Sequence, residues 1–203
     1  MIFSSKYKYI FIHIPKTGGT SIENQLLAVE KMHHRTTFGY SMDYPFKKHI
    51  NVRTLKQLIS PAFFNVLYKW AVVRNPFDRC ISQYYFQKAL WPKLSESLEE
   101  FVAKAEVISQ LDYVQLQGKV VCDIYRFEDG LDNIIKAAST KINAHNQPNP
   151  YKKEFPIIDK LDHHIYGNTR PKGLHYRDAI NPTLRKIIEE KHKKDFEYFN
   201  YDW

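Results

Sequence analysis

Cysteine is nearly absent from this sequence, which has only Cys80 and Cys122 among its 203 residues. Two cysteines are too few for a disulfide framework and fit a reducing compartment, so we interpret both as small buried apolar side chains. No apolar run approaches the length of a membrane span, and no hydrophobic signal-peptide core follows the N-terminus. These absences favour a cytoplasmic protein with no membrane span.

Two common site patterns are missing as well. The cysteines form no Cys-x-x-Cys pair, and the histidines of the C-terminal half lack the i,i+4 spacing of helical metal ligands, so we predict no metal. The Walker A pattern has four residues between its first glycine and Gly-Lys-Ser/Thr, whereas Lys16 here precedes Gly18 and Gly19. An ordinary ATP or GTP phosphate loop is therefore disfavoured.

The composition fits one soluble globular domain, which we place over residues 1–203. Hydrophobic residues make up 43% and charged residues 26%, and neither an internal repeat nor a low-complexity tract is present. The formal net charge of +8 has two interpretations. It either forms a solvated basic surface, or it concentrates anionic ligands such as nucleotides, acidic glycans or nucleic acid.

The stretch from Tyr9 to Leu27 contains the strongest local pattern. Its apolar run, residues 10–14, predicts a strand buried on both faces of a parallel sheet. Pro15 ends that strand, Gly18-Gly19 permits a tight turn, and Thr20-Ser21 favours the start of a helix. Backbone N–H groups, the helix dipole, two hydroxyls and a lysine would then form a receptor for an oxyanion such as a phosphate. The alternative is a turn that serves only chain reversal.

A second strand-to-helix unit runs from Tyr68 to Gln87. Residues 70–73 predict another buried strand, and Asn75-Pro76 predicts the start of a helix. Arg74 follows the carboxyl end of that strand, and Ser82 lies roughly 9 Å along the helix, so guanidinium and hydroxyl could hold one phosphate. Alternatively, Arg74 merely pairs with Asp78, and Ser82 is a surface residue.

Strands alternate with helices along the chain, which predicts an α/β fold with a P-loop-like central parallel sheet flanked by helices. Both anion-binding candidates follow the carboxyl ends of strands, where sites in such sheets lie. The other predicted elements are helices at 51–59, 94–108 and 131–142, a buried strand at 119–127, a C-terminal helix that starts at Asn181-Pro182, and irregular stretches at 33–46 and 143–176.

The octapeptide IPKTGGTS at 14–21 resembles the 5′-phosphosulfate loop of sulfotransferases that use 3′-phosphoadenylyl sulfate (PAPS), most closely the bacterial and Golgi carbohydrate branch. The segment VRNPFDR at 73–79, with Ser82 and Tyr84 after it, is similar to the 3′-phosphate motif of that family. The likeness extends to YRFED at 125–129 and to the closing pattern at 195–201. Golgi members carry a membrane anchor, so its lack here favours a bacterial-type enzyme.

The resemblance implies roles for individual residues. Lys16 would contact the phosphosulfate bridge, the five residues after it would hold the 5′-phosphate, and Arg74 with Ser82 would hold the 3′-phosphate. The segment TRPKG at 169–173 places two cations beside a glycine and could close over a nucleotide phosphate, although it could also be a solvated basic turn. The full nucleotide-binding set is Lys16, Thr17, Gly18, Gly19, Thr20, Ser21, Arg74, Ser82, Arg170, Lys172 and Gly173.

The predicted catalytic residues are Lys16 and His49. Sulfuryl transfer to a hydroxyl or amine needs a group that takes the acceptor proton, and a histidine has a suitable pKa. His49 lies in KKHIN at 47–51, which resembles a Lys-His segment that precedes the second motif in carbohydrate sulfotransferases. Glu23 is the alternative base, or it buttresses the first helix. We interpret His13 as a satisfied core histidine and Arg79 as a partner in structural ion pairs.

The function that these patterns predict is sulfuryl transfer from PAPS to an acceptor, a carbohydrate, with no nucleic-acid partner. A nucleoside or sugar kinase with a divergent phosphate loop is one alternative, but it would need Mg²⁺ and a carboxylate at the strand end where Arg74 stands. A non-enzymatic protein that binds nucleic acid or acidic glycans is the other alternative. Its 14 tyrosines could stack on bases, but most aromatic residues fall in apolar strands and helices.

Overall fold

The computed structural model describes residues 1–30, 49–106, 108–146, 154–161 and 170–203. Contacts within the chain divide it into two compact units. Unit 1 comprises Met1–Val73 and Asp112–His163, and unit 2 comprises Arg74–Leu111 and His164–Trp203. The irregular stretch predicted at 33–46 lies outside the described residues.

Unit 1 is built around a four-stranded sheet of order β1-β2-β3-β6. β2 (Tyr9–Ile12) pairs in parallel with β3 (Tyr68–Val73), which pairs in parallel with β6 (Asp123–Arg126). β2 is buried at every position and β3 at all positions but one, as their unbroken apolar runs predict. A central, mostly parallel sheet flanked by helices confirms the predicted α/β class.

The two edges of this sheet differ from the prediction. β1 (Ile2–Ser4) was not predicted, because three residues are too few to show the alternation of apolar and polar residues that is typical of a strand. It pairs antiparallel with β2, so the sheet is mixed. The single buried strand predicted at 119–127 is wrong. β4 (Gln115–Leu116) and β5 (Lys119–Val120) form a separate two-stranded ribbon, and only β6 joins the main sheet. As an edge strand, β6 is half-buried to exposed.

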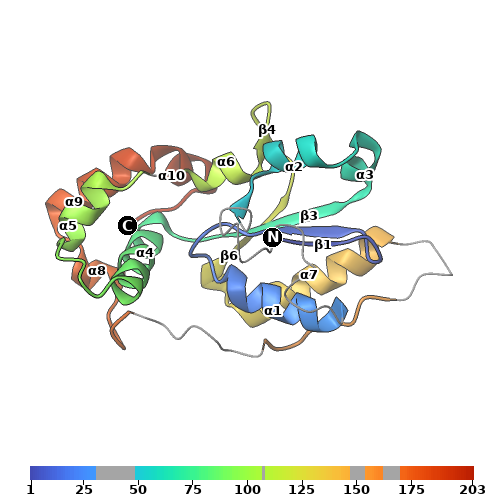
Figure 1. The fold of residues 1–203 in the computed structure, drawn as a ribbon, viewed down its shortest axis with the longest axis horizontal. Helices are drawn as coiled ribbons and strands as arrows, with labels where there is room; N and C mark the ends of the chain where they lie inside the picture. Colours follow the sequence, from blue (N-terminus) through green and yellow to red (C-terminus); the bar gives the residue numbers. More distant parts are fainter. Residues whose placement is uncertain (31–48, 107, 147–153, 162–169) are drawn as a thin grey trace. The chain divides into compact units, whose positions relative to one another are not determined.

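Helices cover both faces of the sheet in unit 1. α1 (Gly19–Glu30) and α7 (Leu131–Asn146) lie on one side of β1, β2 and β3, and α2 (Val52–Leu58) and α3 (Pro61–Val66) lie on the other (Figure 1). The strand residues of the first side share one apolar core with α1 and α7, which includes Phe11, Ile22, Leu26, Trp70, Val72, Ile134, Ile135 and Ala138. Burial of this face fixes α1 against the carboxyl end of β2.

Unit 2 is helical and contains α4 (Pro76–Leu90), α5 (Leu98–Lys104), α8 (Tyr176–Ala179), α9 (Pro182–Lys191) and α10 (Lys193–Phe199). α6 (Gln110–Val114) begins in this unit, and the short 3-10 turn η2 (Phe127–Asp129) follows β6 in unit 1. Asn75 and Asn181 cap α4 and α9 with their side chains, each ahead of a proline, as predicted.

Two helix predictions in unit 2 need correction. The helix predicted at 94–108 is shorter, because the Ser97 capping box starts α5 at Leu98. The C-terminal helix is two helices, α9 and α10, which meet at His192. Among the helices of the described ranges, none is long and apolar enough to cross a bilayer.

Candidate functional site

The predicted phosphate loop in unit 1 has the geometry of a strand, a tight turn and a helix start. Gly18 has φ +78, and Lys16 has φ +68, which is uncommon for a residue with a side chain. Gly18 O accepts the Ser21 N–H at 3.1 Å, so α1 begins at Gly19, earlier than expected. Thr20 and Ser21 therefore lie inside the first turn and do not cap the helix. The N–H groups at the very start of a helix have no acceptor four residues earlier within the helix and point toward the preceding loop.

The two glycines of the loop are needed because the backbone passes close to other side chains. A Cβ on Gly18 would lie 2.8 Å from a methyl carbon of Leu131 and 3.0 Å from the Phe127 ring. A Cβ on Gly19 would lie 2.2 Å from Cδ2 of His13. Thr17 is fully buried, and its hydroxyl donates to the Ile14 carbonyl at 2.9 Å, which ties the loop back to the strand end.

His13 is packed beneath the start of α1, as its interpretation as a core histidine expects. The side chain is 3% exposed, and Nδ1 lies 2.9 Å from Oε1 of Glu23, which is 2% exposed. Burial lowers the pKa of His13 to about 3, against the Glu23 carboxylate, which raises it. The Met1 amino group also contacts Glu23. Glu23 is thus buried between His13 and the Met1 amino group.

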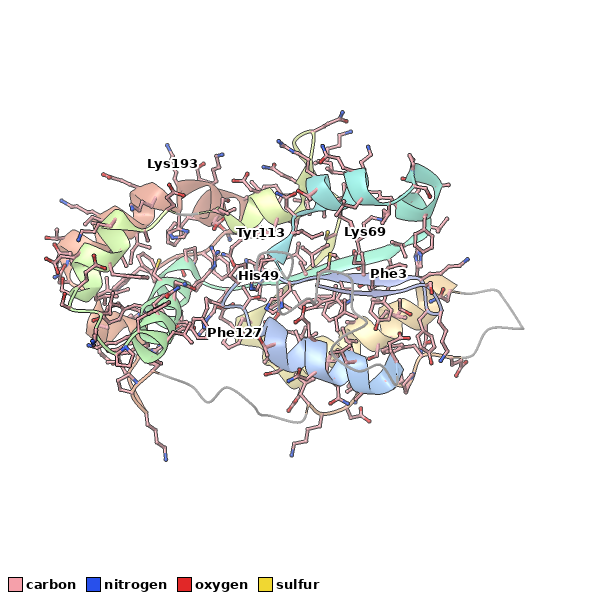
Figure 2. All side chains as sticks on the ribbon, in the orientation of Figure 1. Phe3, His49, Lys69, Tyr113, Phe127 and Lys193 are labelled. Atoms are coloured by element: carbon pink, nitrogen blue, oxygen red, sulfur yellow. The ribbon has the colours of Figure 1, made fainter. Side chains whose placement is uncertain are left out.

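His49 lies against His13. Nδ1 of His49 is 2.9 Å from the His13 carbonyl oxygen, and the two rings meet edge to face with centroids 4.5 Å apart. Figure 2 shows His49 and Phe127 at the end of unit 1 where α1 begins. The structure therefore brings the predicted base and the phosphate loop together through His13, which contacts both Gly19 and His49.

Arg74 in unit 2 is held by a carboxylate. Its Nε donates to Oδ2 of Asp78 at 2.8 Å, and Nη2 lies 2.7 Å from the same oxygen. Arg170 Nη1 donates to the other oxygen of Asp78. The pairing of Arg74 with Asp78, considered above as an alternative to phosphate binding, is present. In addition, two predicted phosphate-binding arginines converge on one acid, so this cluster carries one net positive charge.

The backbone of Arg74 is clamped by Gln110. Oε1 of Gln110 accepts the Arg74 N–H at 2.9 Å, and Nε2 donates to the Arg74 carbonyl at 2.8 Å. Gln110 is itself fully buried, and its N–H donates to Oδ2 of Asp195 at 3.0 Å. These contacts connect the Arg74 backbone to α10 through two buried side chains.

Asp195 is a fully buried hub of unit 2. It accepts hydrogen bonds from the Ser109 hydroxyl and from the N–H groups of Gln110 and Leu111, and Arg79 Nη1 lies 3.9 Å away. Burial alone would raise the pKa of Asp195, but these donors and His192 hold it below the ordinary value. Arg79 also donates to the Ile108 carbonyl, in keeping with the structural role expected for it.

A row of Cys80, His192 and Asp195 has the order of a nucleophilic triad but not its chemistry. Sγ of Cys80 lies 3.3 Å from Nε2 of His192, and Nδ1 of His192 lies 3.5 Å from Asp195. Burial raises the pKa of the Cys80 thiol to about 12, the opposite of an activated thiolate. Cys80 is a buried apolar side chain, as predicted, whereas Cys122 is only partly buried.

The remaining predicted residues are more exposed. Ser82 is half-buried on α4. Lys172 and Gly173 form the exposed centre of a turn closed by the Leu174 N–H on the Pro171 carbonyl at 3.2 Å, and Gly173 has φ +83, which that turn requires. Thr169, the first residue of the predicted segment, lies outside the described residues.

Three site residues were missed as such by reasoning from the sequence: Gln110, Asp195 as a hub, and Asp78 as the shared acid. The pairing of Asp78 with Arg74 was considered from the sequence, whereas its contact with Arg170, 92 positions later, carries no local signal. Gln110 and Asp195 carry no local signal, since their partners are 36 and 85 positions away.

Comparison with known proteins agrees with this geometry. The model of the sulfotransferase family matches residues 1–111, more than half of the 203-residue chain. The matched range contains the phosphate loop, His49, Arg74 and Ser82. A search of curated proteins found no match. On the strength of the family match, the chain belongs to the sulfotransferase family, a family of transferases.

Proposed function

We propose that the protein transfers the sulfuryl group of PAPS to a hydroxyl or amine of a carbohydrate and releases adenosine 3′,5′-bisphosphate. The observation that carries this proposal is the loop between β2 and α1. It combines Gly18 at φ +78, a lysine at φ +68 and the first turn of a 12-residue helix. Helix N-termini and glycine turns present N–H groups to phosphate oxygens. A positive φ at a residue with a side chain costs energy, and such strain is often found in functional loops.

In this proposal the loop holds the 5′-phosphosulfate end of the donor. Lys16 neutralises charge on the bridge oxygen as the bond from that oxygen to sulfur breaks, while Thr20 and Ser21 offer their hydroxyls. Thr17 acts through its backbone, because its hydroxyl proton is engaged by the Ile14 carbonyl. Gly18 and Gly19 let the loop backbone adopt its tight turn against neighbouring side chains.

The 3′-phosphate is assigned to Arg74, Arg170 and Ser82. Two guanidiniums on one carboxylate present a planar, cationic set of donors that suits a phosphate. Lys172 and Gly173 follow Arg170 in an exposed turn, from which the lysine adds positive charge near a bound nucleotide. A net charge of +8 favours an anionic donor and an acidic glycan as acceptor.

His49 is proposed as the general base. It takes the proton of the acceptor hydroxyl as the new oxygen–sulfur bond forms and the bond from sulfur to the bridge oxygen breaks. The reaction needs positioning and charge stabilisation more than covalent catalysis. The contact of His49 with His13, which lies beside the phosphate loop, supports the role of His49 as the base.

Two measurements on the full chain test the proposal. Adenosine 3′,5′-bisphosphate at about 100 times its Kd should add roughly 2.7 kcal/mol, a rise in Tm of about 5–10 °C, whereas ATP–Mg²⁺ and an oligonucleotide should add less. Transfer of labelled sulfate from PAPS to a panel of glycans should then fall by about 10²–10⁴ in kcat for His49→Ala, with bisphosphate affinity retained. Stabilisation by ATP–Mg²⁺ alone would contradict the donor, and full turnover of His49→Ala would contradict the base.

A further inference from the structure

A chain of buried polar groups connects α1 to His49. Glu23 on α1 contacts Nδ1 of His13 at 2.9 Å, and the His13 carbonyl contacts Nδ1 of His49 at 2.9 Å. Glu23 and His13 are 2% and 3% exposed. The link from the His13 carbonyl to His49 has a defined acceptor, so it restricts where the proton of the His49 imidazole resides.

The link to His49 determines which nitrogen carries its proton. A backbone carbonyl can only accept a hydrogen bond, so the His49 Nδ1 that faces it must donate. In a neutral imidazole one nitrogen is protonated and the other holds a lone pair. The lone pair of neutral His49 therefore belongs to Nε2.

The position of the His13 carbonyl depends on its ring, which is held on several sides. Glu23 contacts Nδ1, the Gly19 backbone lies against Cδ2 and Nε2, and the Phe11 ring stacks at 5.9 Å. A ring held in this way cannot turn without moving the first turn of α1 or the Glu23 carboxylate. The backbone of His13 is thus fixed at the end of β2.

We propose that His13, anchored by Glu23, is a positioning residue that fixes His49 in the tautomer with a proton on Nδ1 and a lone pair on Nε2. The inference rests on the proposed function in one respect, that Nε2 is the atom that takes the acceptor proton. Tautomer and base role are separate claims, and separate measurements address them.

The charges around His13 agree with this arrangement. The groups that face its ring are the Glu23 carboxylate, the Met1 amino group beside Glu23, and His49. His13 stays uncharged at neutral pH, because burial holds its pKa at about 3. His13 therefore adds no positive charge at the edge of the His49 ring.

The decisive experiment is ¹⁵N NMR of the full chain with labelled histidine, in which the His49 signals are identified by their loss in His49→Gln. At pH 7.5 the spectrum should show a protonated Nδ1 and an unprotonated Nε2 for His49. A protonated Nε2, or an even mixture of tautomers, would overturn the inference. This measurement needs no turnover, so it is independent of whether His49 is the base.

Variants test the anchoring. His13→Phe keeps a ring of similar size but loses the contact with Glu23, and it should mix the His49 tautomers and lower kcat about 10-fold or more, with bisphosphate Kd within about twofold. Glu23→Gln keeps an acceptor for His13 and should retain most of the tautomer preference. Glu30→Gln is the matched control on the same helix and should change neither the His49 tautomer nor kcat. If His13→Phe fails to fold, Glu23→Leu provides the test; an unaltered tautomer and unaltered kcat in the folded variant would overturn the anchoring role.

Discussion

The two anion-binding candidates of this chain are made in different ways. The loop of unit 1 is mainly backbone: a strand end, Gly18 at φ +78 and the start of α1. The cluster of unit 2 is made of side chains, because Arg74 and Arg170 share Asp78. The first depends on backbone conformation, whereas the second depends on charged side chains that pair with one another.

This difference predicts how each region fails. A backbone receptor is lost when a residue blocks or refolds the loop, and its stability comes from the packing of α1 and His13. A side-chain receptor is lost when one guanidinium or one of its supports is removed, even if the fold persists. Substitutions in unit 2 should therefore separate binding from folding more cleanly.

Removal of the Arg74 guanidinium should have the largest effect on binding. We expect Arg74→Ala to weaken the binding of adenosine 3′,5′-bisphosphate by about 2–5 kcal/mol, because a charged donor pair is lost and the 3′-phosphate is left unpaired. Calorimetry should show a smaller loss for a nucleotide without the 3′-phosphate. Arg185→Ala is the control, since Arg185 pairs with Glu189 at i,i+4 on an exposed helix face. Equal losses for both nucleotides would mean that Arg74 does not recognise the 3′-phosphate.

The loop should respond in turnover as well as in binding. Lys16→Ala should lower kcat by about 10²–10³-fold, the usual loss when one electrostatic donor is removed, and should also weaken the binding of PAPS. Lys8→Ala is a matched control, because Lys8 is another lysine with positive φ, at 48°, in the turn between β1 and β2. Similar kinetics for the two variants would rule out a special role for Lys16.

Stability in acid should reveal the buried histidine beneath the loop. The unfolded chain binds a proton on His13 near pH 6.5, whereas the folded chain resists it until about pH 3. The contribution is therefore complete above about pH 6.5 and is lost as the pH falls toward 3. Between pH 6.5 and 5 the free energy of unfolding should decrease by about 2 kcal/mol from this group.

Denaturant titrations at the two pH values measure this decrease. His13→Gln should remove the part of this pH-dependent decrease that comes from His13. His145→Gln, a change at an exposed histidine, should leave the decrease unchanged. His192 in unit 2 is buried as well, with its pKa lowered, so His13→Gln should leave part of the decrease behind. An unchanged pH dependence in His13→Gln would contradict the buried neutral state.

Loss of the Gln110 clamp should weaken the arginine cluster indirectly. Gln110→Met removes both hydrogen bonds to the Arg74 backbone and should reduce bisphosphate affinity about tenfold, less than Arg74→Ala. Gln115→Met, at a half-buried glutamine that bonds Asp112, is the control. An affinity equal to that of the unmodified protein would show that the clamp serves folding only.

The cysteines should matter least. Cys80→Ala should cost about 1–2 kcal/mol of stability through lost packing, and Cys122→Ala less, because it is only partly buried. Neither change should alter kcat, since the Cys80 pKa is raised to about 12 by burial. Loss of turnover in a stably folded Cys80→Ala variant would contradict this conclusion.

Sequence patterns predicted the features that local chemistry determines. The sequence predicted the buried strands β2 and β3, because burial on both faces requires a run of adjacent apolar residues. It also predicted the starts of α4 and α9, because helix capping requires particular residues at adjacent positions. The contact of Gly19 with the His13 ring was not readable, because it depends on how α1 packs against the strand end. The assignment of one domain to residues 1–203 stays a prediction.

The buried carboxylate of Asp195 has a consequence for the order in which the chain matures during synthesis. It holds Gln110 from 85 positions later in the sequence, and Asn75 donates to the Asp202 carbonyl at 3.0 Å across 127 positions. A ribosome delivers the phosphate loop and Arg74 long before these partners. The buried hydrogen bonds that support the Arg74 backbone are therefore complete only when α10 has emerged.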